Sequence, residues 1–173
     1  WTLNAEAEWR PASDASATLS YGRSQAVNSI DLTGIGAGQV KDWAYQFAQA
    51  RFNKDDFFAQ AFVNWTNSGD TYILRTGQPI RDESWIAVGQ VQHATDVSDR
   101  QRFVYGADYI HTTPATNRTI NGVHEDDDQI DEYGFYLQSE TQLAEPLELT
   151  LAARGDYHSV LDEVKIGRAS CRE

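Results

Sequence analysis

Apolar and polar side chains alternate along most of the chain in segments of about ten residues, the period of a β-strand with two different faces. The clearest segment is Glu132–Leu143, where Tyr133, Phe135 and Leu137 share one parity and polar residues occupy the other. A short polar turn then leads into Leu147–Tyr157, which alternates in the same way. Two such segments joined by a tight turn predict an antiparallel β-hairpin.

The same alternation recurs upstream and predicts about eight strands in all. The expected strands are Leu3–Arg10, Ala17–Val27, Trp43–Phe52, Phe57–Trp65, Trp85–Thr95, Arg102–His111, Glu132–Leu143 and Leu147–Tyr157. The third of these is rich in Ala and Gln and also fits an amphipathic helix, but a strand is the preferred interpretation. The predicted class is therefore all-β.

The expected connectors fall into two classes that alternate strictly along the chain. Four are short, at residues 11–14, 53–56, 96–100 and 144–146, and three are long, at residues 28–42, 66–84 and 112–131. Outer-membrane barrels have short periplasmic turns and long outer loops, and strands of 9–11 residues match a tilted transmembrane strand. The pattern predicts part of an antiparallel up-and-down transmembrane β-barrel. The low mean hydropathy of -0.56 is compatible with this prediction, because every second residue of a barrel strand faces a water-filled interior.

Composition limits the remaining possibilities. The formal net charge of -12 disfavours nucleic acid as a partner. The chain starts at Trp1, has no Met and shows no leader segment, so we expect a piece of a longer protein. Residues Lys165–Glu173 (KIGRASCRE) resemble a translated sequencing adapter, and we expect 165–173 to be non-native and 1–164 to be the partial barrel. Because Cys171 lies in that tail, we expect no disulfide or thiolate metal site.

Three segments carry a family resemblance. The run EYGFYLQSETQLAEPLELTLAARGDYHS (Glu132–Ser159) resembles a late-middle hairpin of TonB-dependent outer-membrane receptors. The run RFVYGADYIHTTP (Arg102–Pro114) resembles another strand and loop of these barrels, and TINGVHEDDD (Thr119–Asp128) resembles the loop that joins the two. Each motif alone is moderately specific, and their order and spacing strengthen the resemblance, which extends over most of Trp1–Val164.

The resemblance implies a 22-stranded barrel plugged by an N-terminal domain, of which this chain would supply about eight strands. It implies a receptor in the cell outer membrane that imports a scarce ligand, such as an iron chelate, cobalamin, an oligosaccharide or a peptide. The implied partners are outer-membrane lipid, the plug domain, the TonB complex and the small ligand. Neither the plug nor the TonB-contacting box is present in this sequence.

Candidate ligand contacts lie in the expected long loops. Arginine beside aromatic rings can bind an anionic chelate, but the same loop could instead pack against a plug or close the outer mouth of the barrel. Acidic side chains can contact a ligand, but an acidic run is also typical of a solvated loop. The candidates are Tyr72, Arg75, Arg81, Asp126, Asp127 and Asp128. The acidic run fits no known calcium loop, and the four scattered His residues suggest no metal site.

A second set of candidates has the parity expected to face the lumen: Arg102, Asp108, Glu140, Arg154 and Asp156. Ordinary cross-strand pairing explains most of them, and Glu140 with Arg154 is the expected ion pair. No nucleophile with a supporting context is present, so we expect no enzyme and no cofactor. The alternatives to a receptor are a porin-like or adhesive barrel and a soluble carbohydrate-binding β-sandwich, which would bury the Leu147, Leu149 and Leu151 row in a core.

Overall fold

The computed structural model describes residues 1–34, 36–120, 122–160 and 164–172, without the side chains of residues 126, 127 and 164–172. The strands are β1 (Thr2–Ala12), β2 (Ala15–Thr33), β3 (Gly36–Lys54), β4 (Phe57–Asn67), β5 (Tyr72–Ile73), β6 (Trp85–Ser98), β7 (Gln101–Thr113), β8 (Ile130–Ala144), β9 (Leu147–His158) and β10 (Val164–Arg172), with a 3₁₀ helix, η1 (Gly122–Asp127), before β8. The described residues contain no helix long and apolar enough to span a bilayer.

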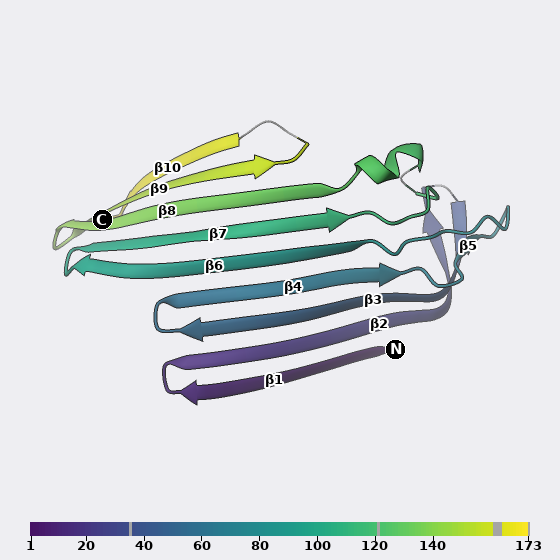
Figure 1. Cartoon of the computed structure of the whole chain (residues 1–173), viewed down its shortest axis with the longest axis horizontal. Coiled ribbons are helices and arrows are strands. Elements are labelled where there is room, and N and C mark those ends of the chain that lie inside the picture. The colour runs from purple at the N-terminus through teal and green to yellow at the C-terminus, as the bar shows by residue number, and fades with distance from the viewer. Residues whose placement is uncertain (35, 121, 161–163, 173) are drawn as a thin grey trace.

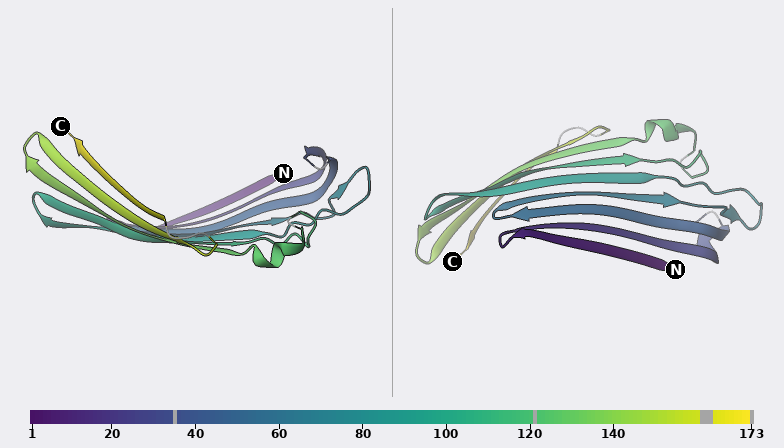
Figure 2. Two further views of the ribbon diagram at one scale, coloured as in Figure 1. Left: turned by 90° about the horizontal axis from the view of Figure 1, so that it is seen from above. Right: turned by 60° about the horizontal axis from the view of Figure 1, so that its bottom comes forward.

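The strands form one antiparallel sheet that follows chain order. Its path is β1-β2-β3-β4-β6-β7-β8-β9-β10, and the short β5 pairs with β3 off this path. Figure 1 shows tight turns at one end of the sheet, the turn end, and the longer connections, β5 and η1 at the other, the loop end. Figure 2 shows a single curved and twisted layer that does not close on itself. The all-β, up-and-down antiparallel prediction is therefore confirmed at the level of an open sheet.

All eight expected strands are present, including Trp43–Phe52, which lies inside β3 and is not a helix. The four short connectors are also confirmed, because two residues separate the paired strands at 13–14, 55–56, 99–100 and 145–146. Period-two alternation was sufficient here because each strand has two distinct faces.

The expected long connector at 28–42 is wrong. These residues extend β2 and β3 into a hairpin that keeps one register from Ala15↔Lys54 to Thr33↔Gly36, with a single gap in the ladder at Val27 and Asp42. Weak alternation of Ile30 and Leu32 with polar neighbours was the missed indication of a strand. The extension is stabilised by the following loop, because β5 pairs with Gly38 and Gln39. Five of the buried residues, Ala44, Ser68, Thr71, Ile73 and Ile80, lie around this junction.

The terminal segment forms β10, which pairs along β9 from Val164↔Asp156 to Arg172↔Glu148. The prediction that Lys165–Glu173 is non-native rests on its sequence, and Glu173 lies outside the described residues. The far edges of β1 and β10 carry no further strand within the described chain.

The cross-strand register sorts side chains into two faces. Partners in an antiparallel pair point to the same side, so Tyr105↔Leu137↔Ala153 lie together on the apolar face and Arg102↔Glu140↔Thr150 lie on the polar face. The Tyr133, Phe135 and Leu137 row and the Leu147, Leu149 and Leu151 row are not sandwiched against a second sheet in the described chain, and Phe135 is 64% exposed. Neither face of the sheet is covered by a second layer here within the described chain.

Glycine opens space for an aromatic ring on the polar face. Gly106 on β7 and Tyr136 on β8 are direct partners, and a Cβ on Gly106 would lie 2.5 Å from Tyr136 Cζ and from the Val91 carbonyl oxygen. The Tyr136 hydroxyl reaches across β7 and donates a hydrogen bond to Gln92 on β6 at 2.7 Å. One missing side chain thereby lets a single ring tie three strands together.

We expect Gly106→Ala to destabilise the folded sheet by about 1–3 kcal/mol, because the added methyl group meets the ring and a backbone carbonyl. The matched control is Gly89→Ala on β6, where a Cβ meets nothing within 4 Å and the change is expected to be neutral or stabilising by up to about 1 kcal/mol. Denaturant titration in detergent micelles measures both, and equal stabilities of the two variants would contradict the packing described.

Candidate functional site

Two rows of aromatic rings cross the apolar face. The loop-end row runs from Tyr21 to Trp65 at a ring-centroid distance of 6.3 Å, continues through Trp85 and His111 at 5.0 Å, and includes the stacked pair Tyr109 and Tyr133. The turn-end row is formed by Phe52, Phe57, His93 and Tyr105, with successive centroids 6.2, 6.3 and 5.5 Å apart. Rings with an apolar body and a polar edge suit the boundary between hydrocarbon and water.

Small residues occupy the band between the two aromatic rows. Phe57 and Trp65 on β4 are separated by eight residues, or about 26 Å along the strand at ~3.3 Å per residue. The cross-strand rows between them are mostly Ala, Gly, Val and Leu. Leu19 is 63% exposed in this band and no layer covers it in the described chain. The apolar face therefore presents a continuous band that requires an apolar partner.

The polar face carries one uninterrupted row of cross-strand partners over eight strands. Direct pairing joins Glu8, Thr18, Arg51, Gln60, Gln90, Asp108, Gly134 and Asp156. Gln60 Nε2 donates to Gln90 Oε1 at 2.8 Å, and Gln60 Oε1 accepts from Gln49 Nε2 at 2.9 Å. Side-chain amides thus bond to one another across β3, β4 and β6, so the sheet is held by side chains as well as by its backbone.

Arg154, on β9 next to this row, reaches across β8 and binds two of the row's carboxylates. Its guanidinium donates to both oxygens of Asp108 on β7, at 2.7 and 2.9 Å, and to Asp156 Oδ1 at 2.8 Å. The path lies over Gly134, where a Cβ would be 2.1 Å from Arg154 Nη2. The glycine is therefore required for a bidentate ion pair between strands that are not neighbours.

The expected Glu140–Arg154 pair is wrong. The register places Glu140 opposite Arg102 and Thr150, whereas Arg154 lies four residues beyond Thr150 on β9. Glu140 instead accepts a hydrogen bond from Gln138 at 2.6 Å. Parity alone placed both residues on one face correctly but contained no information on register.

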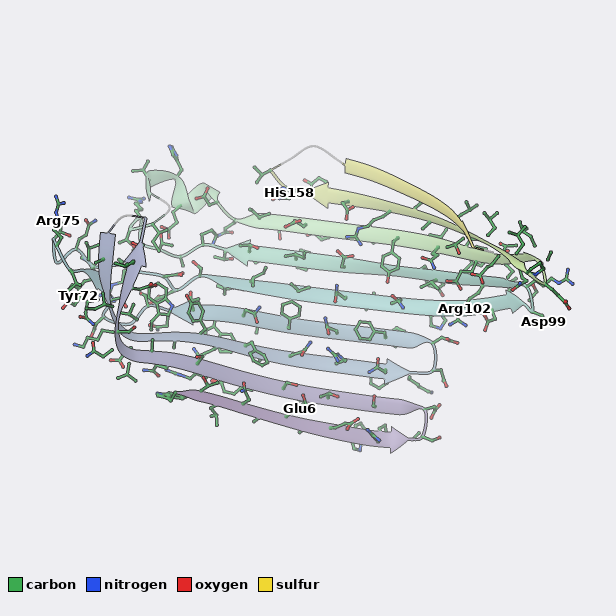
Figure 3. All side chains as sticks on the ribbon, turned by 180° about the vertical axis from the view of Figure 1, so that it is seen from behind. Glu6, Tyr72, Arg75, Asp99, Arg102 and His158 are labelled. Atoms are coloured by element: carbon green, nitrogen blue, oxygen red, sulfur yellow. The ribbon has the colours of Figure 1, made fainter. Side chains whose placement is uncertain are left out.

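Arg102 forms a second charge cluster at the turn end. Its guanidinium lies 2.5 Å from Asp56 and 3.2 Å from Asp96. Asp56 belongs to the β3–β4 turn and Asp96 to β6, so the arginine on β7 ties that turn to the end of β6. All five residues expected to face a lumen, Arg102, Asp108, Glu140, Arg154 and Asp156, lie on the polar face. Figure 3 shows Arg102 and Asp99 at the end of the sheet opposite Tyr72 and Arg75.

The two long loops at the loop end are joined to each other. The amide of Glu83 donates to the Ala115 carbonyl at 2.8 Å, and the Ala115 amide donates to Ser84 Oγ at 3.0 Å. Thr119 Oγ1 accepts from the Arg81 amide at 2.9 Å and donates to the Arg81 carbonyl at 3.1 Å. The described residues 68–84, 114–120 and 122–129 thus form one interlocked unit, here named the loop platform.

Glu125 organises the second half of the loop platform. Its carboxylate, 7% exposed, accepts hydrogen bonds from the amides of Thr116, Asn117 and Arg118 and from the Thr116 hydroxyl. The Thr116 hydroxyl, and after it these backbone amides, lower the pKa of Glu125 although burial opposes the shift. Asn117 and Arg118 have positive φ angles of 48° and 61°, a tight bend that this carboxylate holds.

The candidate loop residues have different environments. Tyr72 pairs with Gln39 in β5, and Arg81 Nη1 donates to the Gly69 carbonyl at 2.7 Å, so Arg81 supports the loop. Arg75 is exposed at the tip of its loop. The Asp128 amide donates to the Glu125 carbonyl at 3.2 Å, and the side chains of Asp126 and Asp127 lie outside the described residues. Ligand contact by these residues remains a prediction.

The structural roles of Thr119 and Glu125 were not predicted from sequence, since Glu125 looked like one member of a solvated acidic run. Within the described residues, no group of three or more His, Cys, Asp or Glu side chains is arranged to hold a metal ion. Comparison with protein-family models, with curated proteins and with solved structures finds no match.

Removal of the Arg154 charge tests the bridge on the polar face. We expect Arg154→Met to cost about 1 kcal/mol of folding free energy, because Asp108 and Asp156 then face each other without a counter-charge while solvent screens part of the loss. The control is Arg100→Met, at an exposed turn residue, with an expected cost below about 0.5 kcal/mol. Urea titration in detergent at low salt is the measurement, and similar costs for the two variants would argue against the bridge.

Loss of the Glu125 charge is expected to loosen residues 116–118. Because the folded pKa is lowered, this carboxylate stabilises the loop above its ordinary pKa of 4.5, and the contribution disappears as the pH falls through the lowered value. In Glu125→Gln, hydrogen exchange of the three amides should therefore be faster than in the unmodified chain at neutral pH. In the unmodified chain the amides should lose their protection only in acid. Glu83→Gln is the matched control. Unchanged exchange in Glu125→Gln would show that groups other than the Glu125 carboxylate protect these amides.

Proposed function

We propose that this sheet is a section of the wall of an outer-membrane β-barrel, with the apolar face toward lipid and the polar face toward the lumen. The observation that carries the proposal is the exposed apolar band bordered by two aromatic rows on a single-layered sheet. Two-residue turns lie at one end, and the extended β2–β3 hairpin and two longer loops lie at the other, which agrees with periplasmic and outer ends.

We further propose that the barrel belongs to a TonB-dependent receptor that imports a scarce ligand, and that its plug, the TonB complex and outer-membrane lipid are its partners. The proposal is supported by the three sequence motifs described above, which lie on β7, β8 and β9 and in the loop between them. The ordered loop platform is consistent with an outer surface that meets a ligand. The larger barrel of the 22-stranded type supplies the strands that cover the edges of this sheet.

Labels placed on the two faces test the orientation. In a Cys171→Ser background, a fluorescent label at Leu137→Cys on the apolar face should be quenched by detergent that carries a spin label on its acyl chain. The matched position is Gln138→Cys on the neighbouring residue, which faces the other way and should remain unquenched. The pair Leu151→Cys and Thr150→Cys repeats the comparison on β9.

Equal quenching on both faces would contradict a lipid-facing surface and a polar lumen. A second measurement is independent of labels. Without detergent the chain should aggregate, because exposed strand edges and an uncovered apolar band favour association. A monodisperse, water-soluble monomer in sedimentation would overturn the proposal.

A further inference from the structure

A cavity of about 590 Å³ lies at the loop end, between the extended β2–β3 hairpin and the loop platform. Its walls come from residues far apart in sequence, such as Asp31 on β2, Tyr45 on β3, Ile80 in the first loop and Ile120 in the second. The volume is within the range of small-molecule sites. Tyr45 and Ser24 are direct partners on the polar face, so the cavity is continuous with that face.

The lining combines apolar and aromatic side chains with a few Ser and Thr hydroxyls and one carboxylate. Trp43 and Tyr45 stand two residues apart on β3, with ring centroids 6.0 Å apart and an angle of 31° between their planes. Tyr45 is 58% exposed although it is a large aromatic residue on the polar face. Val40, Ile80 and Ile120 complete the wall around these rings. Both rings line the recess, and aromatic rings can contact an apolar group or a cation through their faces.

The charge of the cavity is negative. Asp31 is the one charged residue among the lining residues that the structure describes. The surrounding connectors, residues 28–42, 66–84 and 112–129, hold nine acidic and four basic residues, a net charge of -5. Arg81 is already engaged with the Gly69 carbonyl. An anionic ligand would meet repulsion here, whereas a cation meets attraction from the carboxylates and from the ring faces.

We propose that this cavity binds an organic cation with an apolar body, of the quaternary or alkyl ammonium type, with Trp43 and Tyr45 as the ring surface and Asp31 as the counter-charge. The inference rests on the proposed receptor function and specifies the charge of the group that the receptor captures. It differs from the expectation that Arg75 and Arg81 grip an anionic chelate, because it assigns recognition to an aromatic and acidic recess.

Choline and its neutral isostere 3,3-dimethylbutan-1-ol provide the test, since they share shape and differ in charge. The chain is held in polyoxyethylene detergent micelles, whose headgroups contain neither sugar nor ammonium. The Trp43 indole N–H resonance reports on the cavity, and the Trp9 indole on the apolar face is the internal control. Choline should shift Trp43 saturably and bind at least 10-fold more tightly than the isostere.

The variants separate the charge from the rings. Asp31→Asn should bring choline to the affinity of the isostere, and Tyr45→Leu should weaken choline binding at least 10-fold. Asp14→Asn, in the β1–β2 turn at the opposite end of β2, should change nothing. Equal affinities for choline and the isostere, preference for maltotriose or citrate, or no shift of Trp43 would each overturn the inference. The face-specific quenching described above is measured separately, so failure here and failure of the barrel proposal are distinguishable.

Discussion

The structure depends on one constraint, the antiparallel pairing of each long strand with the next long strand along the chain, with only the short β5 off this path. Most of this single layer has no second layer packed against it, so the ladder and the cross-strand side-chain contacts together hold the described chain in shape. The antiparallel register then determines which residues share a face. The apolar band, the aromatic rows and the polar row are all consequences of that register.

Strand positions and faces were accessible from the sequence because alternation is a local property with a period of two. All eight expected strands and the four tight turns are present, and the residues expected to face a lumen do share one face. The extension of β2 and β3 over residues 28–42 was missed because it is stabilised by a loop more than 30 residues further along the chain, through Ile73 opposite Gly38.

Register was the principal feature that alternation left open, and the side-chain contacts depend on it. Arg154 bonds to Asp108 over Gly134 because the three strands align those positions, and a shift of two residues would preserve every face while breaking the pair. The loop platform was inaccessible for a related reason. Its contacts, such as Arg81 with Thr119, join residues 38 positions apart in segments without periodicity.

The interlocking of the two loops has a consequence for how such a surface changes over time. Because Arg81 and Ser84 in one loop bond to Thr119 and Ala115 in the other, an insertion on one side has to leave the shared contacts in place. We therefore expect sequence variation between homologues to concentrate at the exposed tip around Arg75. Substitutions at the joined positions are expected to be correlated. The loop platform would thus keep a constant frame around a variable tip.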